Sequence, residues 1–195
     1  MDDLKVLVDL HVTADRQGPG GDAQTRVAIE LAGLASRRGL TVADIGCGTG
    51  ASTLVLPRHL DAHVVAVDAL PEFLDVLRSR AARAGVAQRI DTVNASMDAL
   101  PFDAASLDAM WSEGAIYNIG FEDGVTQWRR YLKRGGILAV SKLTWLTASR
   151  PAELEAHRAA QYAQVATASA QLAVLGRRGY APIGYFVARK TDDAP

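Results

Sequence analysis

The chain has 195 residues, of which 49% are hydrophobic and 22% are charged, and its formal net charge at pH 7 is −1. This length suits one domain with a single core, and the near-neutral charge argues against a general nucleic-acid binder. No apolar run approaches the roughly 20 residues that span a bilayer, and the acidic start Met1-Asp2-Asp3-Leu4 differs from a secretion signal. We therefore expect a cytoplasmic protein that does not bind membranes.

The predicted elements alternate between helices and strands along the chain. Residues 4–12 could form a helix or a strand, and a loop over 16–21 precedes a helix that begins at Asp22 and ends near Gly39. Strands follow over 41–45, 63–67, 90–94, 107–111 and 137–145, and helices over 51–60, 71–84 and 121–132. Residues 133–136 are expected to form a turn. A long helix over 151–175 and a final strand over 179–190 close the pattern.

This alternation predicts an α/β fold of the Rossmann-like, doubly wound kind, with a mostly parallel sheet and helices on both faces. We find neither an internal repeat nor a linker, so we predict one domain over residues 1–195. Residues 1–40 would supply an N-terminal cap or lid and a first helix, and residues 41–190 the core. The sheet has six strands, or seven if Pro182-Ile183-Gly184 divides the last segment.

A glycine-rich turn, Gly46-Cys47-Gly48-Thr49-Gly50, joins the strand at 41–45 to the following helix. Glycine permits positive φ and a close approach of a ligand to the backbone, so this unit is typical of sites for nucleotide-like ligands. Asp68 ends the next strand, 22 positions after Gly46, where an acid can accept hydrogen bonds from two ribose hydroxyls. The single cysteine, Cys47, excludes an internal disulfide and is interpreted as a buried structural thiol.

Two ligand classes use this arrangement, a dinucleotide and S-adenosylmethionine (SAM), and three features favour SAM. Asp44 precedes the loop, where a carboxylate could meet a methionine amino group but would repel a pyrophosphate. The chain is also short for the second half of a dinucleotide domain. Finally, no Tyr-x-x-x-Lys pair is present at Tyr117 or Tyr131. An NAD(P)-dependent oxidoreductase stays open as an alternative.

The order of these motifs resembles the class I SAM-dependent methyltransferases. It runs through Asp44–Gly50, Val67-Asp68, Asp98–Phe102, Leu107-Asp108 and Gly135–Leu138. The stretches Ser96-Met-Asp-Ala-Leu-Pro-Phe102 and Trp111-Ser-Glu-Gly-Ala-Ile-Tyr-Asn-Ile-Gly-Phe121 are also similar to a narrower group of bacterial small-molecule methyltransferases. The resemblance implies SAM as the cofactor and methyl transfer to N, O or C of a small molecule, or SAM binding without catalysis if the pocket is incomplete.

The resemblance also implies roles by position. Cofactor-binding residues would be Gln17, Asp44, Gly46, Cys47, Gly48, Asp68, Ala69, Ser96, Met97 and Ser112. The segment from Ser112 to Asn118 would face the transferred methyl group, with Glu113 and Tyr117 as catalytic candidates. Glu113 could instead cap the following segment, and Tyr117 could serve only in packing. Gln17-Gly-Pro-Gly20 suits a lid over the cofactor or an ordinary surface loop.

Two further expectations concern metals and assembly. The four histidines show no ligand spacing, so we expect no metal. The family usually ends in a strand hairpin, whereas this chain shows one clear final strand and looks abbreviated. A missing strand would leave an uncovered sheet edge. We therefore expect that a second copy of the chain covers it in a homodimer.

Overall fold

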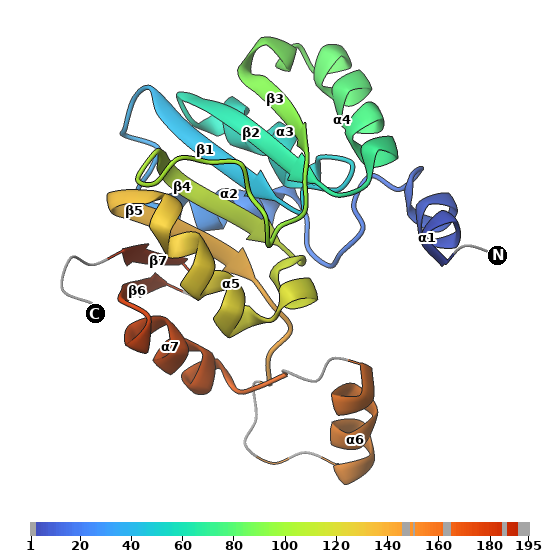
Figure 1. Cartoon of the computed structure of the whole chain (residues 1–195), viewed down its shortest axis with the longest axis vertical. Coiled ribbons are helices and arrows are strands. Elements are labelled where there is room, and N and C mark those ends of the chain that lie inside the picture. The colour runs from blue at the N-terminus through green and yellow to red at the C-terminus, as the bar shows by residue number, and fades with distance from the viewer. Residues whose placement is uncertain (1–2, 146–148, 150, 162–164, 185–186, 191–195) are drawn as a thin grey trace.

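The fold is organised around one sheet of seven strands in the order β3-β2-β1-β4-β5-β7-β6 (Figure 1). The computed structural model describes residues 3–145, 149, 151–161, 165–184 and 187–190. The strands are β1 (Leu40–Ile45), β2 (Ala62–Asp68), β3 (Ile90–Asn94), β4 (Leu107–Glu113), β5 (Leu132–Ser141), β6 (Tyr180–Gly184) and β7 (Val187–Lys190). The first five strands run parallel, and β7 runs antiparallel to both of its neighbours, β5 and β6, which confirms the mostly parallel sheet.

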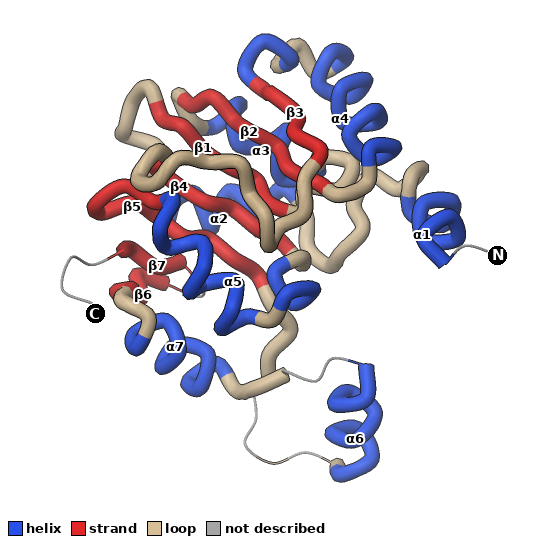
Figure 2. The backbone as a smooth tube through the Cα atoms, viewed as in Figure 1, coloured by secondary structure: helices blue, strands red, loops and turns tan. Residues whose placement is uncertain are grey.

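Seven α-helices lie in the described part of the chain (Figure 2). They are α1 (Asp3–His11), α2 (Asp22–Ala32), α3 (Ala51–His59), α4 (Pro71–Arg83), α5 (Phe121–Trp128), α6 (Ala152–Gln161) and α7 (Ala168–Arg177). Helices α2, α3 and α4 pack their buried residues on one face of the sheet, and α5 and α7 pack theirs on the other. Helix α6 lies apart from the sheet. The two covered faces confirm the doubly wound arrangement.

The core has two halves because strand residues alternate between the two faces. In β1, Val42 packs toward α2, α3 and α4, whereas Ala43 and Ile45 pack toward α5 and α7. In β4, Trp111 belongs to the first half and Met110 to the second. Strands buried on both sides are apolar at nearly every position, so a buried carboxylate on such a strand requires an explanation.

Several predicted boundaries are wrong. The first long helix ends at Ala32 rather than near Gly39, because Gly33 takes a left-handed conformation (φ 63°) that ends the helix. Residues 133–136 belong to β5 instead of forming a turn, and a register shift opposite Leu107 accommodates them. The helix over 151–175 is two helices, and α7 begins after Thr167, whose side chain accepts a hydrogen bond from the Ala170 N–H.

Two open alternatives are decided. Residues 3–11 form a helix, and the C-terminal segment forms two strands, of which β7 pairs with both β5 and β6. The strand that seemed to be missing is therefore present, so the argument for a second subunit at that edge loses its basis. None of the described helices is long and apolar enough to cross a bilayer.

Candidate functional site

The carboxyl ends of the parallel strands form one edge of the sheet. Strand β1 pairs with β2 on one side and β4 on the other. The chain order therefore reverses at β1, and such a switch point is where ligands bind in open α/β sheets. The glycine-rich turn, Asp68 and Ser112–Asn118 all follow or end these three strands. The structure thus brings together the segments that the sequence predicted to form the site.

The glycine-rich turn is packed tightly from both sides. Gly46 and Gly48 have φ of 69° and 55°, in the left-handed region that favours glycine. A Cβ on Gly46 would lie 2.4 Å from the Ala115 Cβ, and one on Gly48 would lie 2.3 Å from Gln17 Oε1. Packing against Ala115 therefore requires the glycine at position 46, whereas the Gln17 side chain could move and the positive φ favours glycine at position 48. Cys47 is buried beside them, and its Sγ lies 3.6 Å from the Gly48 carbonyl oxygen. Its burial confirms the buried cysteine that the sequence predicted, and burial raises the pKa of this thiol.

Asp44 is a fully buried carboxylate near the end of β1. Its Oδ2 accepts hydrogen bonds from Ser52 Oγ at 2.8 Å and from Thr53 Oγ1 at 2.6 Å, both in the first turn of α3. Its Oδ1 is buried without a hydrogen-bond partner. Burial raises the pKa of Asp44 to about 7, although the two hydroxyl hydrogen bonds act in the opposite direction. A cationic ligand group at Oδ1 would satisfy both the free oxygen and the charge.

Asp68 ends β2 and binds the backbone of the glycine-rich turn. The Gly48 N–H donates to its Oδ2 at 2.8 Å, and the Leu70 N–H donates to its Oδ1 at 3.0 Å. Burial raises the pKa of Asp68 against these hydrogen bonds. Each carboxylate oxygen can accept more than one hydrogen bond, so the contacts leave capacity for a ligand hydroxyl. The neighbouring Ala69 is exposed, and its carbonyl accepts from Asn94 Nδ2 at 3.0 Å.

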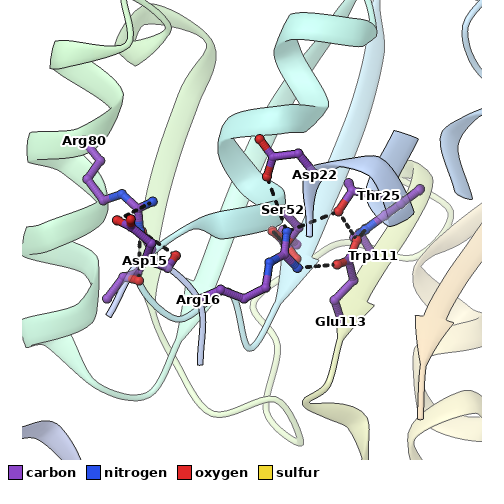
Figure 3. A network of polar contacts seen from close by, with 10 residues as sticks. Asp15, Arg16, Asp22, Thr25, Ser52, Arg80, Trp111 and Glu113 are labelled. Carbon is purple, nitrogen blue, oxygen red and sulfur yellow. Dashed lines mark hydrogen bonds and ion pairs between the residues drawn. The ribbon is translucent and has the colours of Figure 1, made fainter. Parts of the chain in front are cut away.

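Glu113, at the end of β4, is held by three donors (Figure 3). Arg16 Nη1 donates to its Oε2 at 2.7 Å, while Thr25 Oγ1 and Trp111 Nε1 each donate to its Oε1 at 2.8 Å. The predicted alternative, a cap on the following segment, is not the observed arrangement. Glu113 instead joins the segment before α2 to the sheet. Sequence reasoning missed Arg16, because its partner lies 97 positions away.

Gln17 covers the glycine-rich turn. Its Nε2 donates to Thr49 Oγ1 at 2.8 Å and to the carbonyl oxygens of His11 and Ala14 at 3.2 and 3.3 Å. The Thr49 carbonyl also accepts from Arg80 Nη1 at 3.0 Å. Thr49 is completely buried at the centre of these contacts. The structure therefore places Gln17 over the glycine-rich turn, with its amide nitrogen bound by the protein.

The remaining predicted residues differ in accessibility. Met97 lies close to Gly46, and its carbonyl accepts from Trp128 Nε1 at 2.8 Å. Ser96 and Tyr117 are exposed, Tyr117 by 42%. Ser112 is completely buried, and its Oγ has no hydrogen-bond partner. Across the described residues, no three His, Cys, Asp or Glu side chains are grouped as metal ligands.

Lys142, directly after β5, is a site candidate that the sequence analysis missed. Its Nζ is buried without a hydrogen-bond partner and lies 5.0 Å from the centre of the Phe121 ring. Burial lowers the pKa of this lysine to about 8. Its position directly after the end of a strand could have identified it. The fifth strand was predicted to continue to residue 145, however, so Lys142 was placed inside that strand.

Buried polar atoms without partners mark the same edge of the sheet. Within the described part of the chain there are three such side-chain atoms: Asp44 Oδ1, Ser112 Oγ and Lys142 Nζ. They lie at or just after the carboxyl ends of β1, β4 and β5. Buried polar groups in native proteins are nearly always hydrogen-bonded, so their concentration here indicates a site that a polar ligand completes.

Comparison with known proteins relates this chain to a protein family. Residues 42–136 match the family model described as "Methyltransferase domain". This range begins in β1, contains the glycine-rich turn, Asp68 and Glu113, and ends in β5. The matched region therefore includes β2, β3 and β4, most of β1, the first half of β5 and most of the candidate site.

Two curated relatives are similar over this region. Malonyl-[acyl-carrier protein] O-methyltransferase of Herminiimonas arsenicoxydans is 35% identical over 123 residues, which are 62% of this chain and 44% of the relative. The 27-O-demethylrifamycin SV methyltransferase of Amycolatopsis mediterranei is 31% identical over 137 residues, or 69% of this chain and 50% of the relative. The chain thus spans half or less of the length of these relatives.

A solved structure shares the fold. Geranyl diphosphate C-methyltransferase from Streptomyces coelicolor, in complex with Mg²⁺, geranyl-S-thiolodiphosphate and S-adenosyl-L-homocysteine, has a TM-score of 0.67 at 19% identity. The match covers 82% of this chain and 58% of that one. At this identity the likeness concerns the fold alone.

Proposed function

Because residues 42–136 match a methyltransferase domain, we propose that the chain binds SAM at the carboxyl ends of β1, β2 and β4 and transfers the methyl group to a small-molecule acceptor. We further propose that residues 1–195 act as one domain in the cytoplasm. The observation that carries the proposal is Asp44 Oδ1, a buried carboxylate oxygen without a partner directly before the glycine-rich turn. A ligand ammonium group would supply both the hydrogen bond and the positive charge that this oxygen lacks.

The cofactor fits the residues around this oxygen. The methionine part of SAM carries an amino group, which Asp44 would hold beside the backbone of Gly46, Cys47 and Gly48. Asp68 would accept hydrogen bonds from the ribose while keeping its own from Gly48 and Leu70. Ala69 is exposed next to it and would flank the adenine.

Ser96, Met97 and Ser112 would complete the cofactor site. Met97 reaches Gly46 from the side that follows β3, and Ser96 would accept from the adenine amino group. Ser112 offers a buried hydroxyl without a partner. Gln17 would act as the lid, since it already lies against Thr49. The residues are those that the sequence indicated, and the roles proposed here are based on their positions in the structure.

SAM supplies a methyl group that its sulfonium already activates, so the protein contributes mainly position and exclusion of water. Tyr117 is accessible beside the site and would contact the acceptor. Glu113 is bound by three donors. We propose that it acts on catalysis by fixing the segment that carries Arg16, and that it orients an acceptor only when that contact opens.

The names of the relatives support a small-molecule acceptor. Two of them are named for O-methylation, and their acceptors differ widely. The proposed acceptor is accordingly a small molecule that presents O, N or C. Lys142, whose ammonium is buried without a hydrogen-bond partner near Phe121, would favour an acceptor with a negative charge or an acidic hydroxyl.

Calorimetric titration with S-adenosylhomocysteine tests the cofactor, with NAD⁺ titrated in parallel. We expect binding of the first and none of the second, and the reverse would favour an oxidoreductase. Turnover of SAM with a panel of small carboxylates, phenols and amines tests catalysis. Binding of the cofactor without transfer to any acceptor would favour a SAM-binding protein without activity. Light scattering tests the homodimer that was expected from the sequence, and a monomeric mass would refute that expectation.

A further inference from the structure

A cavity of about 540 Å³ lies beside α3 and α4. It is bounded by α3, by the last turn of α4 and by the segment that leads into α2. None of the twelve residues predicted for the cofactor and acceptor site lines it. The cavity thus differs from that site in its lining, although Arg16, the partner of Glu113, lines it as well. Its size is one that holds small-molecule ligands in other proteins.

Four arginines line this cavity against two aspartates. They are Arg16, Arg58, Arg80 and Arg83, and the aspartates are Asp15 and Asp22. Asp15 pairs with Arg80 at 3.3 Å and Asp22 pairs with Arg16 at 3.7 Å, while 98% of the Asp15 side chain and 58% of the Asp22 side chain is exposed. The lining carries a net positive charge although the whole chain carries a net charge of −1. A single-sign excess in a concave site concentrates ligands of the opposite charge.

Two of the four guanidinium groups are used by the protein. Arg80 donates to the carbonyl oxygens of Asp15 and Thr49 at 2.9 and 3.0 Å, and Arg16 binds Glu113. These contacts hold Arg16 and Arg80 in place, and Arg80 lies beside the glycine-rich turn. Their positions are therefore set before any ligand arrives, which lowers the entropy cost of binding.

The other two guanidinium groups are uncommitted. Arg58 in the last turn of α3 and Arg83 in the last turn of α4 make no hydrogen bond or ion pair within the described part of the chain. Both would gain helix-dipole stabilisation at these positions on an open surface. Here, however, they lie across one cavity with Arg16 and Arg80. Leu54 and Val55, which are buried, supply an apolar wall between them.

We propose that this cavity binds a phosphate-bearing small molecule, with Arg58 and Arg83 as the residues that recruit the anion. Guanidinium groups match the oxygen geometry of phosphate through paired N–H donors. Two uncommitted guanidinium groups, with Arg16 and Arg80 beside them around about 540 Å³, suit a diphosphate better than a single carboxylate. The apolar wall at Leu54 and Val55 would contact the uncharged part of the ligand.

Calorimetric titration with inorganic pyrophosphate at constant ionic strength tests the proposal. We expect binding by the wild type and a loss of affinity of about tenfold or more in the double variant Arg58→Gln/Arg83→Gln. The matched control is Arg38→Gln/Arg177→Gln, which removes the same charge from residues outside the cavity and should bind as the wild type does. Equal affinity in the two double variants would refute the proposal, as would no binding by the wild type.

The titration is repeated with saturating S-adenosylhomocysteine, which separates this cavity from the cofactor site. We expect pyrophosphate to bind in both conditions. If S-adenosylhomocysteine abolishes the binding, the anion occupies the cofactor site and the proposal is wrong. ADP and adenosine as further probes test the ligand class, since only ADP carries the diphosphate. Tighter binding of adenosine than of ADP would also overturn the assignment.

Discussion

Replacement of Asp44 by asparagine tests the core of the proposed cofactor site. Asparagine keeps the shape of the side chain and can still bind the hydroxyls of Ser52 and Thr53, but it carries no charge. In the wild type, burial raises the pKa of Asp44 from 3.8 to about 7. The unliganded native state therefore resists ionisation of this carboxyl. We expect Asp44→Asn to increase stability and to decrease cofactor affinity.

The magnitude follows from the pKa shift. A shift of roughly three units corresponds to about 4 kcal/mol of destabilisation once the carboxyl is ionised. Because the folded pKa is raised, this destabilisation is absent below pH 3.8, grows as the pH rises toward 7 and is complete above it. Allowing for imperfect hydrogen bonds of the amide, we expect Asp44→Asn to be more stable by about 2–4 kcal/mol near pH 8 and by about 1 kcal/mol or less near pH 4.5.

Urea denaturation at both pH values measures the stability, and calorimetric titration with S-adenosylhomocysteine measures the affinity. Loss of a charge-assisted hydrogen bond to the amino group should weaken binding by about 10- to 100-fold. Affinity of the wild type should also rise with pH up to about 7, because the ionised carboxylate is the form that binds an ammonium.

Asp108→Asn is the matched control, and we expect it to change the stability in the opposite direction. Asp108 lies in β4 away from the carboxyl edge and accepts from Lys133 Nζ at 2.8 Å and from the Thr41 N–H at 3.0 Å. Burial alone would raise the pKa of Asp108, but these hydrogen bonds outweigh it and lower the pKa. Its stabilisation is present above pH 3.8 and is lost as the pH falls, so Asp108→Asn should be less stable near neutral pH and should bind the cofactor normally.

The reasoning would be refuted if Asp44→Asn were less stable than the wild type near pH 8, or if its stability difference did not change with pH. Either result would mean that the carboxylate has a partner in solution. If Asp44→Asn bound S-adenosylhomocysteine as tightly as the wild type does, Asp44 would not contact the amino group of the cofactor, whatever the stability of the variant.

Three further variants test other parts of the site. Glu113→Gln weakens the contact with Arg16 and should lower stability by about 1–3 kcal/mol and speed proteolysis before α2; loss of turnover with unchanged proteolysis would instead indicate a direct catalytic role. Asp68→Asn should lower the affinity for S-adenosylhomocysteine by about tenfold in calorimetric titration. An affinity equal to that of the wild type would contradict the proposed contact between Asp68 and the ribose. Burial lowers the pKa of Lys142 from 10.5 to about 8, so its ammonium destabilises the protein at neutral pH and this effect disappears as the pH rises above 8. Lys142→Met should therefore be more stable by about 1–2 kcal/mol near pH 7 in urea denaturation, after allowance for solvent screening, and a less stable variant would contradict this.

The parts of the fold that depend on neighbouring residues could be predicted from the sequence. The strand at 41–45, the glycine-rich turn and the helix after it form one local unit, and Asp68 follows at the distance that one helix and one strand require. The buried partners of Asp44 also belong to this unit, since Ser52 and Thr53 lie in the first turn of that helix. Such contacts are fixed once the local structure forms.

The parts that depend on distant contacts could not be predicted in the same way. The bond from Arg16 to Glu113 joins residues 97 positions apart, and no periodicity or motif links them. Lys142 was hidden because strand ends are set by pairing with β4 and β7, not by the apolar run alone. The division of the C-terminal segment into β6 and β7 follows from pairing as well, since Pro182 lies in β6, which forms the sheet edge and is where a strand tolerates proline.

The polar contacts of the N-terminal segment also explain how a cofactor could enter. Gln17 binds Thr49, Arg16 binds Glu113 and Asp15 binds Arg80 through hydrogen bonds and ion pairs. Each such bond contributes only about 1 kcal/mol net, because water replaces it when the segment moves away. Separation of a helix from the apolar core would cost far more. The segment can therefore open over the glycine-rich turn while the sheet and its helices stay intact, which is the property that a lid over a buried cofactor requires.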